Sequence, residues 1–405
     1  MATAAPDDRA VSAAVPTGPA QVAVVSFLAA RAAPTGGFWI ALAGGVALAR
    51  TAERRGARLG FGASAAAMLE TVAIIGPARF GIPLTQAATA PMIGRLEARG
   101  VAVLPQLLAC AAIRLLHNAA TTAFFIWVIA GGLDAYAGTY DAIGRRVGIE
   151  VGTADALGLT IAGLLAWAAF ASTVQVLVYR RGLRDWDRLA ASAEDETDVT
   201  RDIGGQRQPR AAAARVAKKR RRWDPRAVTL AAAVAFALLL SGTSWPLLAA
   251  VAGALAIAWV AAPTDREPVK TGLIFAAILA GGALAFALGG GLGLDEAARR
   301  ATRAALLVMV ATWMRAAAGA EGLREVGRRV LGKLRRVPAA NEAALVLDHI
   351  ESEARLAEAG RALADELDGV EKRPMPFVDA VLRWVVRESE ARDAQAGARA
   401  DTSRL

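Results

Sequence analysis

Residue types that commonly build catalytic and metal sites are scarce in this sequence, which has one cysteine, two histidines and three tyrosines. A single thiol, Cys110, cannot form a disulfide within the chain. No group of Cys and His residues has the spacing of a structural zinc site. We therefore expect neither a bound metal nor a cofactor.

Motifs for catalysis and for nucleotide binding are missing as well. His349 has no serine, carboxylate or second histidine in a recognisable pattern around it, so no catalytic triad can be named. The segment Gly327–Leu334 superficially resembles a phosphate-binding loop. However, Leu334 stands where that motif needs Ser or Thr, and a helix is predicted before it where the motif needs a strand. The sequence thus predicts that the chain is not an enzyme and does not hydrolyse ATP itself.

Long apolar stretches dominate what the sequence does contain. Hydrophobic residues make up 55% of the chain, and its mean hydropathy is +0.38. Ala, Leu, Val and Gly form nearly uncharged runs of about 15–24 residues, and a helix needs about 20 such residues to cross the hydrocarbon core of a bilayer. The runs are continuous and do not alternate as the strands of a membrane barrel would. The pattern predicts an all-α, polytopic membrane protein.

The expected spans fall into two halves, with about 8–9 transmembrane helices in total. In the first half they lie at about 37–50, 59–77, 101–132 and 157–179, with a short or broken helix at 78–100. In the second half they lie at about 227–242, 245–262, 271–293 and 301–317.

Charged residues separate these runs and set the expected domains; the net charge is +10. We expect a disordered or interfacial segment (1–36), a transmembrane domain (37–180), a charged linker (181–226), a second transmembrane domain (227–318), a region of coupling helices (319–395) and a tail (396–405). Lys and Arg concentrate in the linker and beyond residue 320, which places both in the cytoplasm. The expected location is the cytoplasmic membrane of a bacterium. No aromatic platform accompanies the basic runs, so we expect membrane lipid and not nucleic acid as a partner.

Polar residues within the first-half spans form the first candidate site: Glu70, Thr85, Gln86, Arg114, His117 and Asn118. A charged side chain inside a bilayer is costly, so Glu70 needs a partner or a cavity. Arg114 and His117 are the expected partners. The group either lines a substrate cavity or holds helices together, and both interpretations stay open.

The C-terminal region carries apolar stripes at helical spacing, one at Leu356, Gly360, Leu363, Leu367 and Val370 and another at Phe377, Val381, Trp384 and Val385. Such stripes predict amphipathic helices. They either dock on a partner or pack on each other.

The second half resembles the transmembrane T component of energy-coupling factor transporters over about 223–395. The resemblance lies in the layout: a basic start at Gly293–Arg300 before the run Ala304–Trp313, then Gly322–Arg329, the proline Pro338 and the two helices Glu342–Leu367 and Phe377–Ala394. It implies a membrane scaffold that couples a separate ATP-binding-cassette ATPase to import of a vitamin or metal ion. The first half would then supply a substrate-binding module.

In that family each coupling helix carries an Ala-Arg-Gly type of signature whose Arg seats on the ATPase. Ala354-Arg355 and Ala391-Arg392 take the comparable places, followed here by Leu356 and Asp393. Arg361 lies on the same helix as Arg355. Arg suits an acidic groove because its planar fork makes paired hydrogen bonds.

Two other functions remain possible from the sequence. One is a non-transporting assembly or regulatory protein whose helices dock on a partner. The other, which the sequence supports least, is a lipid enzyme that uses Glu70 and His117.

Overall fold

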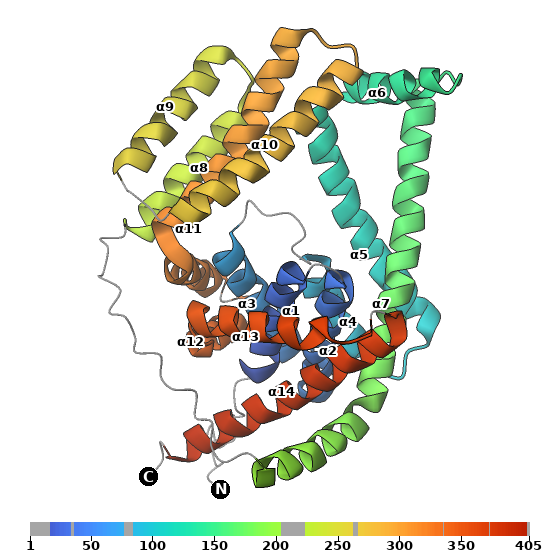
Figure 1. The fold of residues 1–405 in the computed structure, drawn as a ribbon, viewed down its shortest axis with the longest axis vertical. Coiled ribbons are helices and arrows are strands. Elements are labelled where there is room, and N and C mark those ends of the chain that lie inside the picture. Colours follow the sequence, from blue (N-terminus) through green and yellow to red (C-terminus); the bar gives the residue numbers. More distant parts are fainter. Residues whose placement is uncertain are drawn as a thin grey trace, which may run out of the picture.

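The computed structural model describes residues 17–33, 36–76, 84–203, 223–261, 266–334, 336–371 and 373–402. These residues form helices and short connections, with no β-strand among them (Figure 1). In chain order the elements are α1 (Thr17–Ala32), α2 (Gly37–Arg55), α3 (Ala57–Ile75), α4 (Leu84–Glu97), α5 (Val103–Phe124), the π-helical segment η2 (Phe125–Ala130), α6 (Leu133–Arg146), α7 (Thr153–Ile203), α8 (Pro225–Ser241), α9 (Trp245–Ala261), α10 (Arg266–Gly289), α11 (Leu294–Lys333), α12 (Pro338–His349), α13 (Glu353–Asp368) and α14 (Pro374–Thr402).

Five helices in the described part of the chain are long and apolar enough to cross a membrane: α3, α5 with η2, and parts or all of α7, α10 and α11. This fits an α-helical membrane protein. The predicted number of about 8–9 spans is too high. The helices α8 and α9 are apolar but have only 17 residues each, and α4 has 14 residues. Each is shorter than the roughly 20 residues that a perpendicular crossing needs.

One group of helices packs around α1, in the lower part of Figure 1. The side chains of α1 between Ala20 and Phe27 are almost completely inaccessible, and α2, α3, α13 and α14 pack against this helix. The two predicted apolar stripes cover part of α1, since Leu356, Leu363, Phe377 and Val381 are all buried in the same core. The C-terminal helices therefore pack on the N-terminal helices of the chain.

A second group consists of α8, α9, α10 and the first part of α11. Its core contains Leu239, Leu248, Val310 and Trp313. The two groups are joined by α11, which bends sharply at Gly319, where φ is 70°. A glycine is needed there because other residues rarely adopt a positive φ. Beyond the bend, α11 packs against α3 and α12.

The helices α5 and α7 extend from the first group toward α6, which packs on α10 (Figure 1). Together with η2 they expose large apolar side chains, among them Leu108, Trp127, Leu165 and Phe170. Such a surface is stable against lipid and would be unfavourable in water. At the end of η2, Arg303 and Arg300 of α11 donate to the carbonyl oxygens of Val128 and Ala130. These bonds satisfy backbone acceptors that a helix end leaves free.

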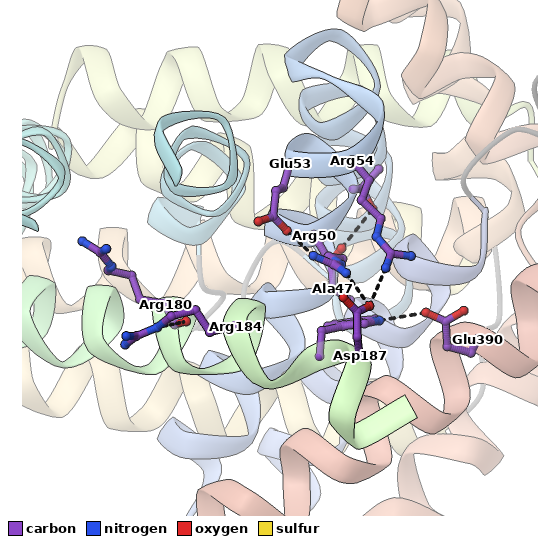
Figure 2. Close-up of polar contacts among 10 residues, drawn as sticks. Ala47, Arg50, Glu53, Arg54, Arg180, Arg184, Asp187 and Glu390 are labelled. Atoms are coloured by element: carbon purple, nitrogen blue, oxygen red, sulfur yellow. Dashed lines mark hydrogen bonds and ion pairs between the residues drawn. The ribbon is translucent and has the colours of Figure 1, made fainter. Parts of the chain in front are cut away.

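The charged segment 181–226, predicted as a linker, continues α7 as a helix to Ile203. Residues 204–222 lie outside the described part. In this extension Leu183 and Trp186 are buried. Asp187 accepts from both Arg50 and Arg54 of α2, and the Trp186 indole donates to Glu390 at 2.8 Å (Figure 2). The start of the segment therefore joins α7 to α2 and α14.

Candidate functional site

The carboxylate Glu70 of α3 is fully buried, but its partner is not the predicted one. Arg324 of α11, beyond the bend, binds both carboxylate oxygens: its Nε donates to Oε2 at 2.6 Å and its Nη2 donates to Oε1. The same Nη2 also donates to the Glu351 carbonyl oxygen at 3.0 Å. The expected pairing with Arg114 or His117 is wrong. The pair instead fastens the second part of α11 to α3.

Arg114 lies in a different polar cluster, between α4, α5 and α7. Its side chain is 8% exposed, and its Nη2 donates to Gln175 Oε1 at 2.6 Å. Gln175 Nε2 in turn donates to Thr89 Oγ1 at 2.8 Å, and Thr89 donates to the Thr85 carbonyl oxygen. No carboxylate among the described residues forms an ion pair with Arg114, so a buried cation is held by neutral groups alone.

Several buried polar atoms on α4, α5 and α7 have no hydrogen-bond partner among the described residues: Arg114 Nε, Gln86 Oε1, Ser172 Oγ and Asn118 Nδ2. Gln86 and Tyr179 lie beside α2, because a Cβ on Gly45 would overlap Tyr179 Oη and lie 3.4 Å from Gln86 Oε1. Buried polar atoms are normally bonded, and leaving one unpaired costs about 1–3 kcal/mol. The cluster thus has capacity for further hydrogen bonds.

The structure therefore divides the predicted polar site. Gln86 and Arg114 belong to one cluster, Asn118 lies one turn along α5 from Arg114, and Glu70 belongs to the pair with Arg324. The His117 ring is half-buried and forms no hydrogen bond with another described residue. Sequence reasoning missed Gln175, Ser172 and Tyr179. Their signal was present in the sequence, because these polar side chains lie near the end of the mostly apolar run 157–179.

The carboxylate of Glu97 is already bonded to two other side chains. It accepts from Gln106 at 2.7 Å and pairs with Arg180 at 3.1 Å. These bonds connect the end of α4 to α5 and α7. Arg114 therefore has no acidic residue among its bonded partners.

The two predicted coupling arginines have opposite environments. Ala354, Arg355 and Arg361 lie on the exposed face of α13, opposite the buried stripe. Ala391 is exposed too, but Arg392 is enclosed: its side chain is 14% exposed and pairs with Glu388 at 2.8 Å and Glu351 at 3.2 Å. It also donates to Gln21 Oε1 of α1. Arg392 thus connects α14 to α1 and to the turn before α13.

Asp393, next to Arg392, lies under the start of α1. A Cβ on Gly18 would be 2.6 Å from its Oδ1, and Arg55 pairs with it at 2.9 Å. Burial raises the pKa of the Asp393 carboxyl, and the Arg55 guanidinium opposes that rise. Replacing Asp393 with a small residue such as glycine would remove the ion pair with Arg55.

Comparison of the chain with models of protein families, with curated proteins and with solved structures finds no match.

Proposed function

We propose that the chain is the membrane component of an uptake transporter for a small anionic molecule, held at the cluster around Arg114. The observation that carries this proposal is a guanidinium that is 8% exposed and has no carboxylate partner among the described residues. A buried charge without a counter-charge is strongly unfavourable in a low-dielectric environment. An anionic solute would supply both the missing charge and partners for the unpaired donors.

The chemistry of the cluster also narrows the substrate class that the resemblance implies. Arg114 would repel a metal cation, and no group of three or more His, Cys, Asp or Glu among the described residues is arranged to hold a metal. Amide and hydroxyl groups of Gln86 and Tyr179 suit a polar organic molecule. A vitamin bearing a carboxylate therefore fits this site better than a metal ion.

Replacing Arg114 should abolish anion binding. We expect one of four probes, namely biotin, nicotinate, pantothenate or succinate, to raise the melting temperature of the detergent-purified protein. At a probe concentration of about 100 times Kd the stabilisation is about 2.7 kcal/mol. The shift should vanish in Arg114→Leu, because the leucine removes the charge that binds the anion. Differential scanning fluorimetry measures both.

The control for this experiment is Arg188→Leu, at a position that is 72% exposed; it should keep the full shift. Suppose that no probe stabilises the wild type and that Arg114→Leu melts at or above the wild-type temperature. Arg114 would then be a helix–helix contact only, and the transport proposal would lose its basis.

Coupling to a separate ATPase would use the exposed face of α13. Arg355 is exposed, whereas Arg392 is committed to Gln21, Glu388 and Glu351. This face equally suits the second candidate function, an assembly or regulatory protein that docks a partner without nucleotide-binding sequence. The exposed pair Arg355 and Arg361 favours docking in either case.

Substitution of each arginine separates the roles of Arg355 and Arg392. Arg355→Glu should abolish co-purification of the partner from detergent extract while changing stability by less than about 0.5 kcal/mol. Arg392→Ala should lower stability by about 1–3 kcal/mol, because Glu351, Glu388 and Gln21 lose a buried partner. Mass spectrometry of the captured protein distinguishes an ATPase from another partner. An Arg355→Glu variant that still captures the same partner would refute docking through α13.

A further inference from the structure

Two grooves on the surface of the protein adjoin each other at α8. The first has a volume of about 530 Å³ and lies between α8, α9 and α11. Its lining is entirely apolar and includes Leu230, Leu238, Val251, Leu255 and Trp313. An open apolar groove on helices of this kind is suited to a hydrocarbon chain.

The second groove, of about 870 Å³, lies between the start of α8, the last turns of α11 and α12. Its charged lining consists of Arg226, Arg328, Arg329, Lys333 and a single acid, Asp348. Leu230 lines both grooves, so the cationic groove adjoins the apolar one at this residue.

The four cations are not fully neutralised by the protein. Arg328 and Arg329 share Glu325, and Arg328 also reaches Asp348 at 3.3 Å. Arg226 and Lys333 are exposed and form no ion pair with another described residue. The groove therefore keeps a net positive charge with two guanidinium or ammonium groups available to a ligand.

Two tryptophans lie beside these grooves. Trp223, just before α8, is 41% exposed and contacts the Trp313 ring edge-on, with ring centroids 6.5 Å apart. Tryptophan is enriched where a membrane protein passes from the hydrocarbon to the headgroup region. Trp313 lines the apolar groove, and Trp223 lies three residues before Arg226 of the cationic groove, so the aromatic pair lies where apolar and charged surfaces approach each other.

We propose that the two grooves together form a binding site for an anionic phospholipid. The phosphate lies between Arg226, Arg329 and Lys333, and an acyl chain follows the apolar groove past Leu230 and Val251. Basic pockets between membrane helices recognise anionic headgroups through this combination of charge and apolar surface. A free phosphate would use only the cationic groove, and a zwitterionic lipid would gain little from its net positive charge.

Native mass spectrometry of the full-length protein in detergent tests the site. The probes are phosphatidylglycerol, phosphatidylcholine with the same acyl chains, and inorganic phosphate. We expect one phosphatidylglycerol to bind more tightly than phosphatidylcholine. In the double variant Arg226→Ala, Lys333→Ala its affinity should fall on the order of 30-fold, because each cation near a headgroup contributes about 1 kcal/mol.

Two matched controls distinguish this site from general charge and surface effects. Arg145→Ala with Arg188→Ala removes the same charge at positions 66% and 72% exposed, and it should bind phosphatidylglycerol as the wild type does. Ala254→Phe places a ring in the apolar groove and should weaken lipid binding about tenfold without altering phosphate binding, whereas Ala256→Phe, which does not line the groove, should have no effect.

Equal binding of the two lipids, unchanged in both groove variants, would overturn the proposal and leave only non-specific solvation. Competition by inorganic phosphate together with full binding in Ala254→Phe would overturn it too, since it would show an anion site that does not use the acyl chain.

Discussion

Glu70→Leu is expected to lower the free energy of unfolding by about 3–5 kcal/mol, the usual cost of breaking a buried ion pair by removing one partner. Glu70 is fully buried, and both of its oxygens are bound by Arg324. Leucine would leave a guanidinium that is 17% exposed without its counter-charge. The pair also holds the bent end of α11 on α3, so its loss should loosen both helix groups. Reversible unfolding in mixed micelles of increasing SDS fraction, followed by tryptophan fluorescence, measures the change.

The matched control makes the same substitution in an exposed pair. Glu371 is 59% exposed and Arg373 is 79% exposed, so Glu371→Leu should cost at most about 1 kcal/mol. The double variant Glu70→Leu, Arg324→Leu should recover part of the lost stability, because no unpaired charge remains. Equal stability of Glu70→Leu and Glu371→Leu would show that the buried pair does not hold α11 in place.

Local patterns in the sequence were enough to find the amphipathic helices at the C-terminus. Leu356, Gly360, Leu363 and Leu367 recur at helical spacing, and all four are buried on one face of α13. The pattern does not say what covers that face. The cover is α1, where a Cβ on Gly360 would be 3.0 Å from Leu28 Cβ. The apolar sequence of α1, a helix of 16 residues, is compatible with either lipid or protein around it. The position of α1 at the centre of a core was therefore not predictable.

Contacts between residues that are far apart in the sequence could not be predicted either. Glu70 and Arg324 lie 254 positions apart, and nothing in the local sequence links them. From charge alone, Arg114 is an expected partner of Glu70, because both residues lie in the first half of the chain. The structure gives Arg114 a neutral partner, Gln175, which no charge rule would select.

The number of spans was overestimated for a related reason. Residues 37–50 are apolar, but in the structure they belong to α2, which continues to Arg55 and is largely buried against other helices. Hydropathy measures how well a segment tolerates an apolar environment, and a protein core provides one as well as a bilayer does. The distinction depends on tertiary packing, which composition does not encode.

Gly94→Ala is expected to destabilise the protein by about 2–3 kcal/mol, although alanine is the better helix former. Gly94 lies inside α4, where a Cβ would come within 1.9 Å of the Ala49 carbonyl oxygen and 2.7 Å of its carbon. Backbone atoms in the middle of α2 cannot move aside as a flexible side chain would, so the two helices must separate. Far-UV circular dichroism during thermal unfolding in detergent measures the loss.

Gly163→Ala should have the opposite effect and increase the stability of the protein. Gly163 lies inside α7, where a Cβ would have no atom of another described residue within 4 Å, so alanine should stabilise the helix by about 0.5–1 kcal/mol. Because α4 also carries Gln86 and Thr89, separation of α4 from α2 should displace polar groups around Arg114. Gly94→Ala is therefore expected to weaken the stabilisation by the carboxylate probe, and Gly163→Ala to preserve it. Stabilisation by both exchanges would contradict the close packing of α4 on α2.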